Sequence, residues 1–585
     1  MTGQAGRVMV PLKNALPESS PADLLLHGKV VNVHAGSISE SYVGIKNGIV
    51  SYVGSKLIPA KNLLRLHSQC ILPAYIDGHI HIESSLMIPS QFAATVIPRG
   101  TCCVVADPHE IANVKGVEGI RFMMEDSART PLRTYFMIPS CVPATHLETS
   151  GATIGIKEIE KLKKSKRILG LGEVMNFQGV INRDKTIMEK IRACEGMVID
   201  GHAPGLRGEE LSAYVSAGIG SDHESVSKEE AREKHSLGMW IMIREGSTAK
   251  NLSELAGIVS KGSPERVMLV TDDKHAEDLL TEGHMDHCLR RAVEEGIEPV
   301  DAARMATIKP AKYFGLTNLG EIAPGKWADI VVVNDLEQFE AKMVLIAGKI
   351  AAKDGQYLGG FTGPPPSVAV KGTMNMRKVQ PKDLSIKYCR EDRKGEGKVT
   401  ARVIGIAEDQ VTTQGLRYEM EVRRGEVHAD PERDLLKICV AERHKGTGRI
   451  GKGFVKGFGL KHGALASTVS HDSHNMIAIG ESDVELCRAM NRLRETNGGL
   501  VVADRNRILD ELPLPIAGLM TSLEATDIAS KVKELRETSA TLGCTLNNPF
   551  MTLSFLALPV IPKLKITDYG LVDAEGLKVV DLFVE

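Results

Sequence analysis

The chain has 585 residues, of which 43% are apolar and 25% charged, and this balance excludes a disordered or fibrous protein. Its 72 basic and 74 acidic residues leave a formal charge of −2, which argues against nucleic-acid binding because phosphate neutralisation needs clustered lysine and arginine. No apolar run reaches the roughly 18 residues that suggest a membrane span. We expect two or three domains that bind neither nucleic acid nor membrane.

The first twenty residues lack the apolar core of a signal peptide. The ten cysteines are spread along the chain without a CxxC pair, and several, such as Cys102 and Cys103, stand inside apolar strings. Reduced cysteines in such strings behave as small hydrophobic residues. Both observations predict a cytoplasmic protein whose thiols are structural.

Short strands separated by turns are expected over residues 22–70, and Asn47-Gly48 is a hairpin turn that requires positive φ. A similar strand-rich texture returns at residues 319–358. We predict that these two segments together form one small β-sandwich domain that flanks the central part of the chain.

The central residues, 71–318, repeat a short apolar string followed, in most cases, by a charged, helix-prone stretch. The strings are ILPAYID, TCCVVAD, TYFMIP, RILGLGE, GMVIDGH, GIGSDH, MWIMIRE and RVMLVTDD. Eight buried strands that alternate with helices predict an α/β fold, a (β/α)8 barrel, with a doubly wound open sheet as the alternative. A proline-rich linker, GFTGPPPS, then leads to residues 368–585, which we expect to form a separate mixed α/β domain.

Polar residues stand directly after the apolar strings, at the predicted carboxyl ends of strands, which in a barrel open onto one face. His79 and His81 alternate on an extended strand, so both imidazoles point to the same side and can bind one metal ion. Two solvent-exposed histidines are the alternative interpretation. Four further candidates end later strings: Glu173, His202, His223 and Asp272. Burying each such group costs several kcal/mol unless it is paired, and metal ligation would satisfy all of them together.

Several longer motifs carry a resemblance to a known family. They are DGHIHIE (77–83), HIESSL (81–86), ADPHEIANVKG (106–116), GLGEVMNF (170–177), IDGHAPGL (199–206), GIGSDHES (218–225), VTDDK (270–274), GEIAPGKWADIVVV (320–333) and ASTVSHDSHNMIAIG (466–480). With these motifs the sequence resembles the amidohydrolase superfamily and, within it, the bacterial and archaeal adenine deaminase family. The resemblance covers nearly the whole chain.

The resemblance implies a metal centre with two divalent ions. One ion would be bound by His79, His81 and Asp272, the second by His202 and His223, and Glu173 would bridge the two. Occupancy by a single ion remains an alternative. Imidazole and carboxylate ligands without thiolate suit Mn²⁺, Fe²⁺ or Zn²⁺, and the resemblance favours manganese or iron.

The implied reaction is the hydrolytic deamination of adenine to hypoxanthine and ammonia, in purine salvage and adenine catabolism. A metal-bound hydroxide would attack C6 of adenine, with Asp272 as the proton shuttle. The alternatives are another amidohydrolase that acts on a cyclic amide or amidine, and a barrel scaffold without catalytic activity. The resemblance also suggests a homo-oligomer, either a dimer or a tetramer.

Two further groups have both functional and structural interpretations. His109 and Glu110 follow the second predicted strand, where they could contact the substrate, protonate the ring or bind an extra metal ion. A polar turn that caps a helix after Asp107-Pro108 is the alternative. The motif VSHDSHNM predicts a substrate-binding loop in the last domain, or else a solvated hairpin loop, and its candidate residues are His471, Asp472, His474 and Asn475.

Overall fold

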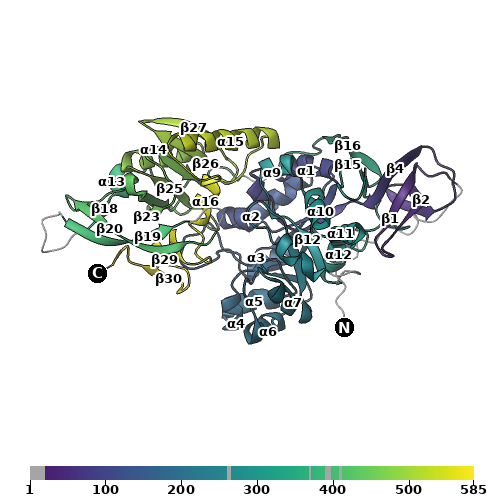
Figure 1. Ribbon diagram of the computed structural model, residues 1–585, viewed down its shortest axis with the longest axis horizontal. Coiled ribbons are helices and arrows are strands. Elements are labelled where there is room, and N and C mark those ends of the chain that lie inside the picture. Colours follow the sequence, from purple (N-terminus) through teal and green to yellow (C-terminus); the bar gives the residue numbers. More distant parts are fainter. Residues whose placement is uncertain (1–19, 260–264, 368–369, 389–396, 407–410, 585) are drawn as a thin grey trace. The chain divides into compact units, whose positions relative to one another are not determined.

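The computed structural model describes residues 20–259, 265–367, 370–388, 397–406 and 411–584. The chain divides into two compact units, each drawn from several segments (Figure 1). The first unit comprises Met1–Pro108, Met123–Ser140 and Gly155–Ser367, and the second comprises His109–Phe122, Cys141–Ile154 and Val368–Glu585. None of the helices in the described ranges is long and apolar enough to cross a membrane.

Strands from both flanks of the first unit form one eight-stranded sheet in the order β17-β16-β15-β14-β4-β1-β2-β3. Their bounds are β1 Leu24–Asn32, β2 Ser37–Lys46, β3 Ile49–Gly54, β4 Leu63–Pro73, β14 Ile330–Val333, β15 Ala341–Ile346, β16 Lys349–Lys353 and β17 Gln356–Tyr357. The β2–β3 hairpin turns at Asn47 and Gly48 with φ of 51° and 79°, as the sequence predicts. Alternate strand residues such as Leu26, Val43 and Ile330 fill its core. The exact domain boundaries stay a prediction.

The centre of the first unit is a curled parallel sheet. One part has the order β13-β5-β6-β7-β8-β9 and the other β10-β11-β12. The bounds are β5 Tyr75–His81, β6 Thr101–Ala106, β7 Arg133–Ile138, β8 Ile168–Val174, β9 Val198–Gly201, β10 Ser221–Asp222, β11 Trp240–Arg244, β12 Val267–Val270 and β13 Asp272–Asp273.

The two parts of this sheet join at both ends. Only Thr271 separates β12 from β13, and β13 pairs in parallel with β5, the first strand. At the other end the Gly220 N–H donates to the Ile199 carbonyl over 2.9 Å. The last strand therefore lies beside the first, which agrees with the predicted (β/α)8 class and excludes the open doubly wound alternative.

Helices occupy the connections between these strands. The principal helices are α1 Pro89–Val96, α2 His109–Ser127, α3 Ile156–Leu162, α5 Lys185–Ala193, α6 Gly208–Ser216, α7 Lys228–Ser236, α10 Met285–Glu294, α11 Pro299–Met305 and α12 Ile308–Tyr313. The charged stretches KEIEKLKKSK and SKEEAREKHS are largely helical, as expected, and form most of the helices α3 and α7. The N-termini of α5 and α7 are capped by Asp184 and Ser227, whose side chains accept backbone N–H groups. Helix α2 begins in the second unit and ends in the first.

The second unit is a mixed α/β structure, as predicted. Its main sheet has eleven strands, ten of them in the order β18-β21-β20-β19-β23-β22-β25-β24-β26-β27, with β31 beside β19. The bounds are β18 Ile386–Lys387, β19 Gly397–Gly405, β20 Gln414–Arg423, β21 Glu426–Val427, β22 Leu436–Ala441, β23 Ile450–Lys456, β24 Ala464–Ser467, β25 Met476–Gly480, β26 Gly499–Asp504, β27 Arg507–Pro513 and β31 Phe583–Val584.

The remaining elements of this unit are the helices α13 Pro381–Leu384, α14 Asp483–Glu495, α15 Ala525–Thr541 and α16 Pro549–Phe555, and the small sheet of β28 Leu564–Thr567, β29 Gly570–Asp573 and β30 Lys578–Val580. Helix α14 buries Leu486, Met490 and Leu493 in a core shared with strand residues. The nine described cysteines are buried and form no disulfide with one another, as predicted, and Cys389 lies outside the described residues.

Candidate metal centre

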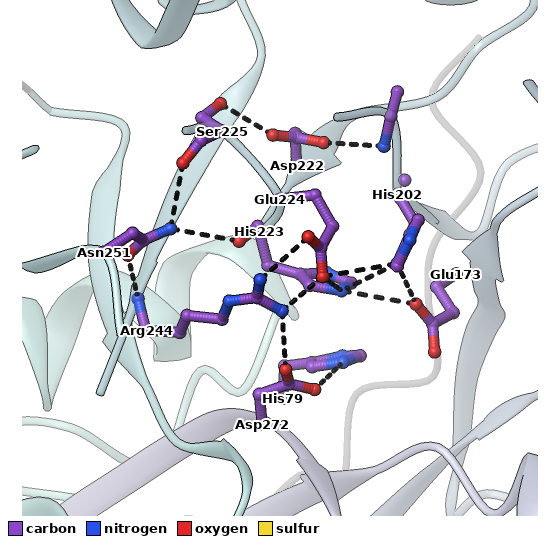
Figure 2. A network of polar contacts seen from close by, with 12 residues as sticks. His79, Glu173, His202, Asp222, His223, Glu224, Ser225, Arg244, Asn251 and Asp272 are labelled. Carbon is purple, nitrogen blue, oxygen red and sulfur yellow. Dashed lines mark hydrogen bonds and ion pairs between the residues drawn. The ribbon is translucent and has the colours of Figure 1, made fainter. Parts of the chain in front are cut away.

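The six predicted metal ligands lie together in the first unit, at the carboxyl ends of strands of the curled sheet. Figure 2 shows five of them converging. His79 and His81 belong to β5, Glu173 to β8 and Asp272 to β13, while His202 and His223 directly follow β9 and β10. All except the half-buried His202 are at most 5% exposed.

The Glu173 carboxylate lies between two groups of imidazoles. Its Oε1 is 3.4 Å from His81 Nε2, whereas its Oε2 is 2.7 Å from His202 Nδ1 and 3.2 Å from His223 Nε2. Each carboxylate oxygen thus faces a different histidine group. This is the arrangement that a carboxylate needs to hold two cations at once.

Asp272 completes the first of these groups. Its Oδ1 lies 3.4 Å from His79 Nε2 and 3.2 Å from His81 Nε2. Its backbone has φ of 61°, in the left-handed region, which non-glycine residues occupy mainly where the surrounding structure requires it. The turn after β12 therefore aims this side chain at the two histidines.

The chemistry of this set fits a divalent metal ion. His79 Nε2 is buried without a hydrogen bond to any described residue, and Asp272 Oδ1 lies 3.4 Å from it. Nitrogen and oxygen donors about 2.1 Å from one ion stand about 3.4 Å apart in tetrahedral geometry, close to the observed separations. With imidazole and carboxylate donors and no thiolate, the set suits Mn²⁺, Fe²⁺ or Zn²⁺.

Asp107 positions two of the ligands. Its backbone carbonyl accepts a hydrogen bond from His81 Nδ1 over 2.9 Å, which turns His81 Nε2 toward the centre. Its side-chain Oδ2 accepts the Glu173 N–H over 3.1 Å. A Cβ at Gly172 would lie 1.9 Å from this same Oδ2, so the glycine of LGLGE makes room for the Asp107 carboxylate.

Arg244 and Glu224 also belong to the centre, although neither is among the residues predicted from the sequence. Arg244 Nη1 donates to Asp272 Oδ2 over 2.7 Å, and its Nη2 donates to Glu224 Oε2 over 2.8 Å (Figure 2). The sequence did hold a signal, because Arg244 is the last residue but one of the string MWIMIRE and Glu224 follows His223. Both stand at strand ends, as the selected ligands do.

The carboxylates of the centre favour positively charged groups among them. Burial alone would lower the pKa of His202, but the Glu224 and Glu173 carboxylates raise it to about 9. Burial would raise the pKa of Glu224, yet the Arg244 guanidinium and nearby imidazoles hold it below its usual range. A cation placed among these carboxylates would be stabilised by the same charges.

Asp222 ties together the segments that carry the two later histidines. Its Oδ1 accepts the Ala203 N–H over 2.9 Å, and its Oδ2 accepts from Lys234 Nζ over 2.9 Å and from Ser225 Oγ over 2.7 Å. Burial would raise the pKa of Asp222, but Lys234 and His223 lower it to about 2. The buried carboxylate is therefore ionised and fully bonded, which holds His202 and His223 in place (Figure 2).

The structure gathers the other predicted site residues in the second unit. Glu110 Oε1 lies 2.6 Å from His471 Nδ1 and 3.3 Å from His109 Nε2, and its Oε2 contacts His474 Nε2. Neither His109 nor Glu110 caps a helix, since the N-terminus of α2 has no side-chain cap. The capping alternative is therefore not supported.

The segment between β24 and β25 is buried, so the interpretation as a solvated hairpin loop is wrong. The exposed fractions are 5% or less for its four candidate residues, His471, Asp472, His474 and Asn475. Asn475 Nδ2 donates to the Thr149 carbonyl over 2.9 Å. The predicted contact of these residues with the substrate stays a prediction.

Comparisons with known proteins match a family model to the main part of each unit. Residues 70–351 match the amidohydrolase family, and residues 410–578 match the adenine deaminase C-terminal domain. The chain is 43% identical to "Adenine deaminase 2" of Carboxydothermus hydrogenoformans, over 98% of this chain and 99% of that protein. It is 45% identical to an adenine deaminase of Desulfatibacillum aliphaticivorans (96% and 97% covered) and 46% identical to one of Archaeoglobus fulgidus (93% and 91% covered).

Proposed function

The chain belongs to the adenine deaminase family of amidohydrolases, and we propose that it hydrolyses adenine to hypoxanthine and ammonia. In this reaction a bond forms between C6 and a water oxygen, the bond from C6 to the amino nitrogen breaks, and the nitrogen leaves as ammonia. The observation that carries the proposal is the position of Glu173 between two groups of histidines at the carboxyl ends of the strands.

Six residues would hold two divalent ions, manganese or iron with zinc as an alternative. His79, His81 and Asp272 would hold one ion and His202 and His223 the other, with Glu173 between them. When bound, such ions supply Lewis acidity and lower the pKa of water to about 7, so that a nucleophile is available at neutral pH. The protein supplies the positions of the donors and the buried carboxylate charge.

Asp272 is the proposed proton carrier. It would take a proton from the attacking water and deliver it to the departing amino group, a transfer that typically contributes about 10²–10⁴-fold to the rate. Burial would raise the pKa of Asp272, but the neighbouring imidazoles of His79 and His81 and the charge of Arg244 hold it well below its usual range. The carboxylate is therefore ionised and ready to accept a proton, while Arg244 fixes its Oδ2.

The remaining predicted residues enter the proposal as contacts to adenine. Glu110 and His109 would act as catalytic groups on the purine ring, and His471, Asp472, His474 and Asn475 would bind the substrate. The support for these roles is that Glu110, His109, His471 and His474 meet in one buried cluster. From the family resemblance we also propose a cytoplasmic homo-oligomer, dimer or tetramer, that serves purine salvage.

A substrate panel tests the proposal. Purified protein, stripped with a chelator and reloaded with Mn²⁺ or Fe²⁺, is offered adenine and a set of cyclic amides such as hydropyrimidines, and ammonia release is measured for each. We expect ammonia from adenine together with the ultraviolet change to hypoxanthine. Turnover of a cyclic amide without turnover of adenine would assign the centre to another amidohydrolase reaction.

A further inference from the structure

We propose that the second unit holds a metal centre of its own, in which His109 Nε2, His471 Nδ1, Glu110 Oε1 and Asp472 Oδ1 bind one divalent transition-metal ion. All four residues belong to the second unit, whereas the six ligands around Glu173 belong to the first. These four residues are among those proposed above as contacts to adenine. Ligation of an ion would replace their direct contacts with the ring, and it requires no particular substrate.

The donor geometry repeats that of the first centre. Glu110 Oε1 lies 2.6 Å from His471 Nδ1 and 3.3 Å from His109 Nε2, and His109 Nε2 lies 4.0 Å from Asp472 Oδ1. Around Glu173 the corresponding separations run from 2.7 to 3.4 Å. In both places a buried carboxylate lies among imidazole nitrogens, and at least one of these comes from a segment distant in sequence.

The hydrogen bonds show which of these side chains can bind the ion and which cannot. The Ser470 N–H donates to His474 Nδ1 over 3.1 Å, so in the neutral imidazole Nε2 carries the proton and donates it to Glu110 Oε2. His474 therefore orients Glu110 and does not ligate. The other oxygen of Glu110, Oε1, is the one that faces His109 and His471.

His471 is held in the orientation that ligation requires. Its ring stacks on Phe555 of α16, with ring centroids 4.7 Å apart and an interplanar angle of 20°. This packing fixes the plane of the imidazole, and its Nδ1 faces Glu110 Oε1. A ligand whose ring is already immobilised loses little side-chain entropy when it binds an ion.

The buried carboxylates around this site favour a cation. Glu110 and Glu148 are buried in the second unit, and within the described part of the chain neither forms an ion pair with lysine or arginine. Both oxygens of Glu148 are buried without a hydrogen bond of standard geometry to any described residue. A divalent ion between Glu110 and Asp472 would stabilise these buried carboxylates.

The donor types indicate which ions would bind. Two imidazoles and two carboxylates suit Zn²⁺, Mn²⁺ or Fe²⁺ rather than Ca²⁺ or Mg²⁺, which prefer oxygen ligands. The Cys141 thiol adjoins this set, since its Sγ lies within 4.8 Å of the donor atoms of His109 and Asp472. Sulfur so close to the site favours Zn²⁺ among the three.

Metal-edge diffraction locates the ion directly. Crystals of the full wild-type chain, stripped with a chelator and reloaded with Zn²⁺, are measured at the zinc edge. We expect an anomalous peak bounded by His109 Nε2, His471 Nδ1 and Glu110 Oε1. The absence of a peak there, whether or not the centre around Glu173 is filled, overturns the proposal, and adenine turnover of the same sample tests the proposed function separately.

Metal stoichiometry in solution gives a second test with matched controls. His471→Asn and Asp472→Asn should each bind one zinc ion per chain fewer than wild type in equilibrium dialysis. His462→Asn removes a histidine of the second unit that pairs with Asp504 instead, and it should bind as many ions as wild type. Circular dichroism checks that each variant is folded. Wild-type stoichiometry in folded His471→Asn and Asp472→Asn contradicts the proposal.

Discussion

Arg244 Nη1 donates to Asp272 Oδ2 over 2.7 Å, so the proposed proton carrier is held by a guanidinium from β11, the strand that pairs with β12. The other carboxylate oxygen of Asp272 faces His79 and His81. One oxygen of Asp272 therefore faces the proposed metal ligands, and the other accepts a hydrogen bond from one fixed positive charge. Its basicity depends on Arg244 as well as on the histidines.

Replacing Arg244 should weaken catalysis and shift its pH dependence. In Arg244→Gln the positive charge is lost, so the pKa of Asp272 rises and the acid limb of the kcat/KM profile moves to higher pH. We expect kcat to fall by about 10–100-fold, the usual effect of removing a group that orients a metal ligand. Arg291→Gln, a surface variant in α10, is the control and should keep the wild-type profile. An unchanged acid limb in Arg244→Gln would mean that Asp272 does not set it.

Gly172 should tolerate no side chain. The Cβ of Gly172→Ala would lie 1.9 Å from Asp107 Oδ2, which would displace the carboxylate that bonds the Glu173 N–H and disturb the carbonyl that orients His81. We expect metal content and activity to fall at least about tenfold. Gly360→Ala is the matched control, because a Cβ there meets no atom within 4 Å. Full metal content in Gly172→Ala would show that Asp107 does not position the ligands.

Lys565 gives the second unit a predictable pH dependence of stability. It is fully buried, with Nζ donating to the Val411 and Phe555 carbonyls, and burial lowers its pKa from 10.5 to about 7. Below pH 7 both the folded and unfolded chains carry the charge, so its burial penalty is complete. Between pH 7 and 10.5 the unfolded chain binds more protons, so the free energy of unfolding rises with pH.

Lys565→Met removes this penalty. At pH 6 the variant should be more stable than wild type by about 2 kcal/mol, and the difference should shrink as the pH approaches 10.5. Chemical denaturation at a series of pH values measures it. Lys578→Met, at an exposed position of β30, should show no such trend. A stability gain that is constant with pH would exclude titration of Lys565 as its cause.

Much of the curled central sheet of the first unit could be predicted because strands such as β5 and β6 are buried on both faces. The string TCCVVA became β6, and every one of its six residues is buried, which is why it reads as a continuous apolar run. The sequence could not show how far regular pairing extends. Strand β10 is only Ser221–Asp222, and His223 directly after it belongs to the metal centre.

The metal ligands could be predicted from their position directly after apolar strings. Arg244 was missed although it stands in the same kind of position. A polar residue directly after an apolar string signals a strand end, and this singled out Glu173, His202 and Asp272. Arg244 gives the same signal, but an arginine is not a metal ligand, and its role depends on Asp272, which is 28 residues away. Asp107 was missed because it acts partly through its backbone carbonyl.

The buried cluster of the second unit shows more clearly which contacts cannot be predicted from the sequence. His109 and Glu110 stand 361 or more residues before His471, and no periodicity links such distant segments. Only the folded chain reveals that they meet. Glu148, which lies outside any helix or strand, gave no sequence signal at all.

The most direct test of the central claim is adenine turnover by protein stripped of metal and then reloaded with Mn²⁺ or Fe²⁺. Reloaded wild-type protein should release ammonia from adenine, and stripped protein should not. Glu173→Gln and Asp272→Asn should lower turnover by at least about 10²-fold after the same treatment. Failure to deaminate adenine when metal is demonstrably bound at Glu173, or equal turnover in the stripped protein, would contradict the account.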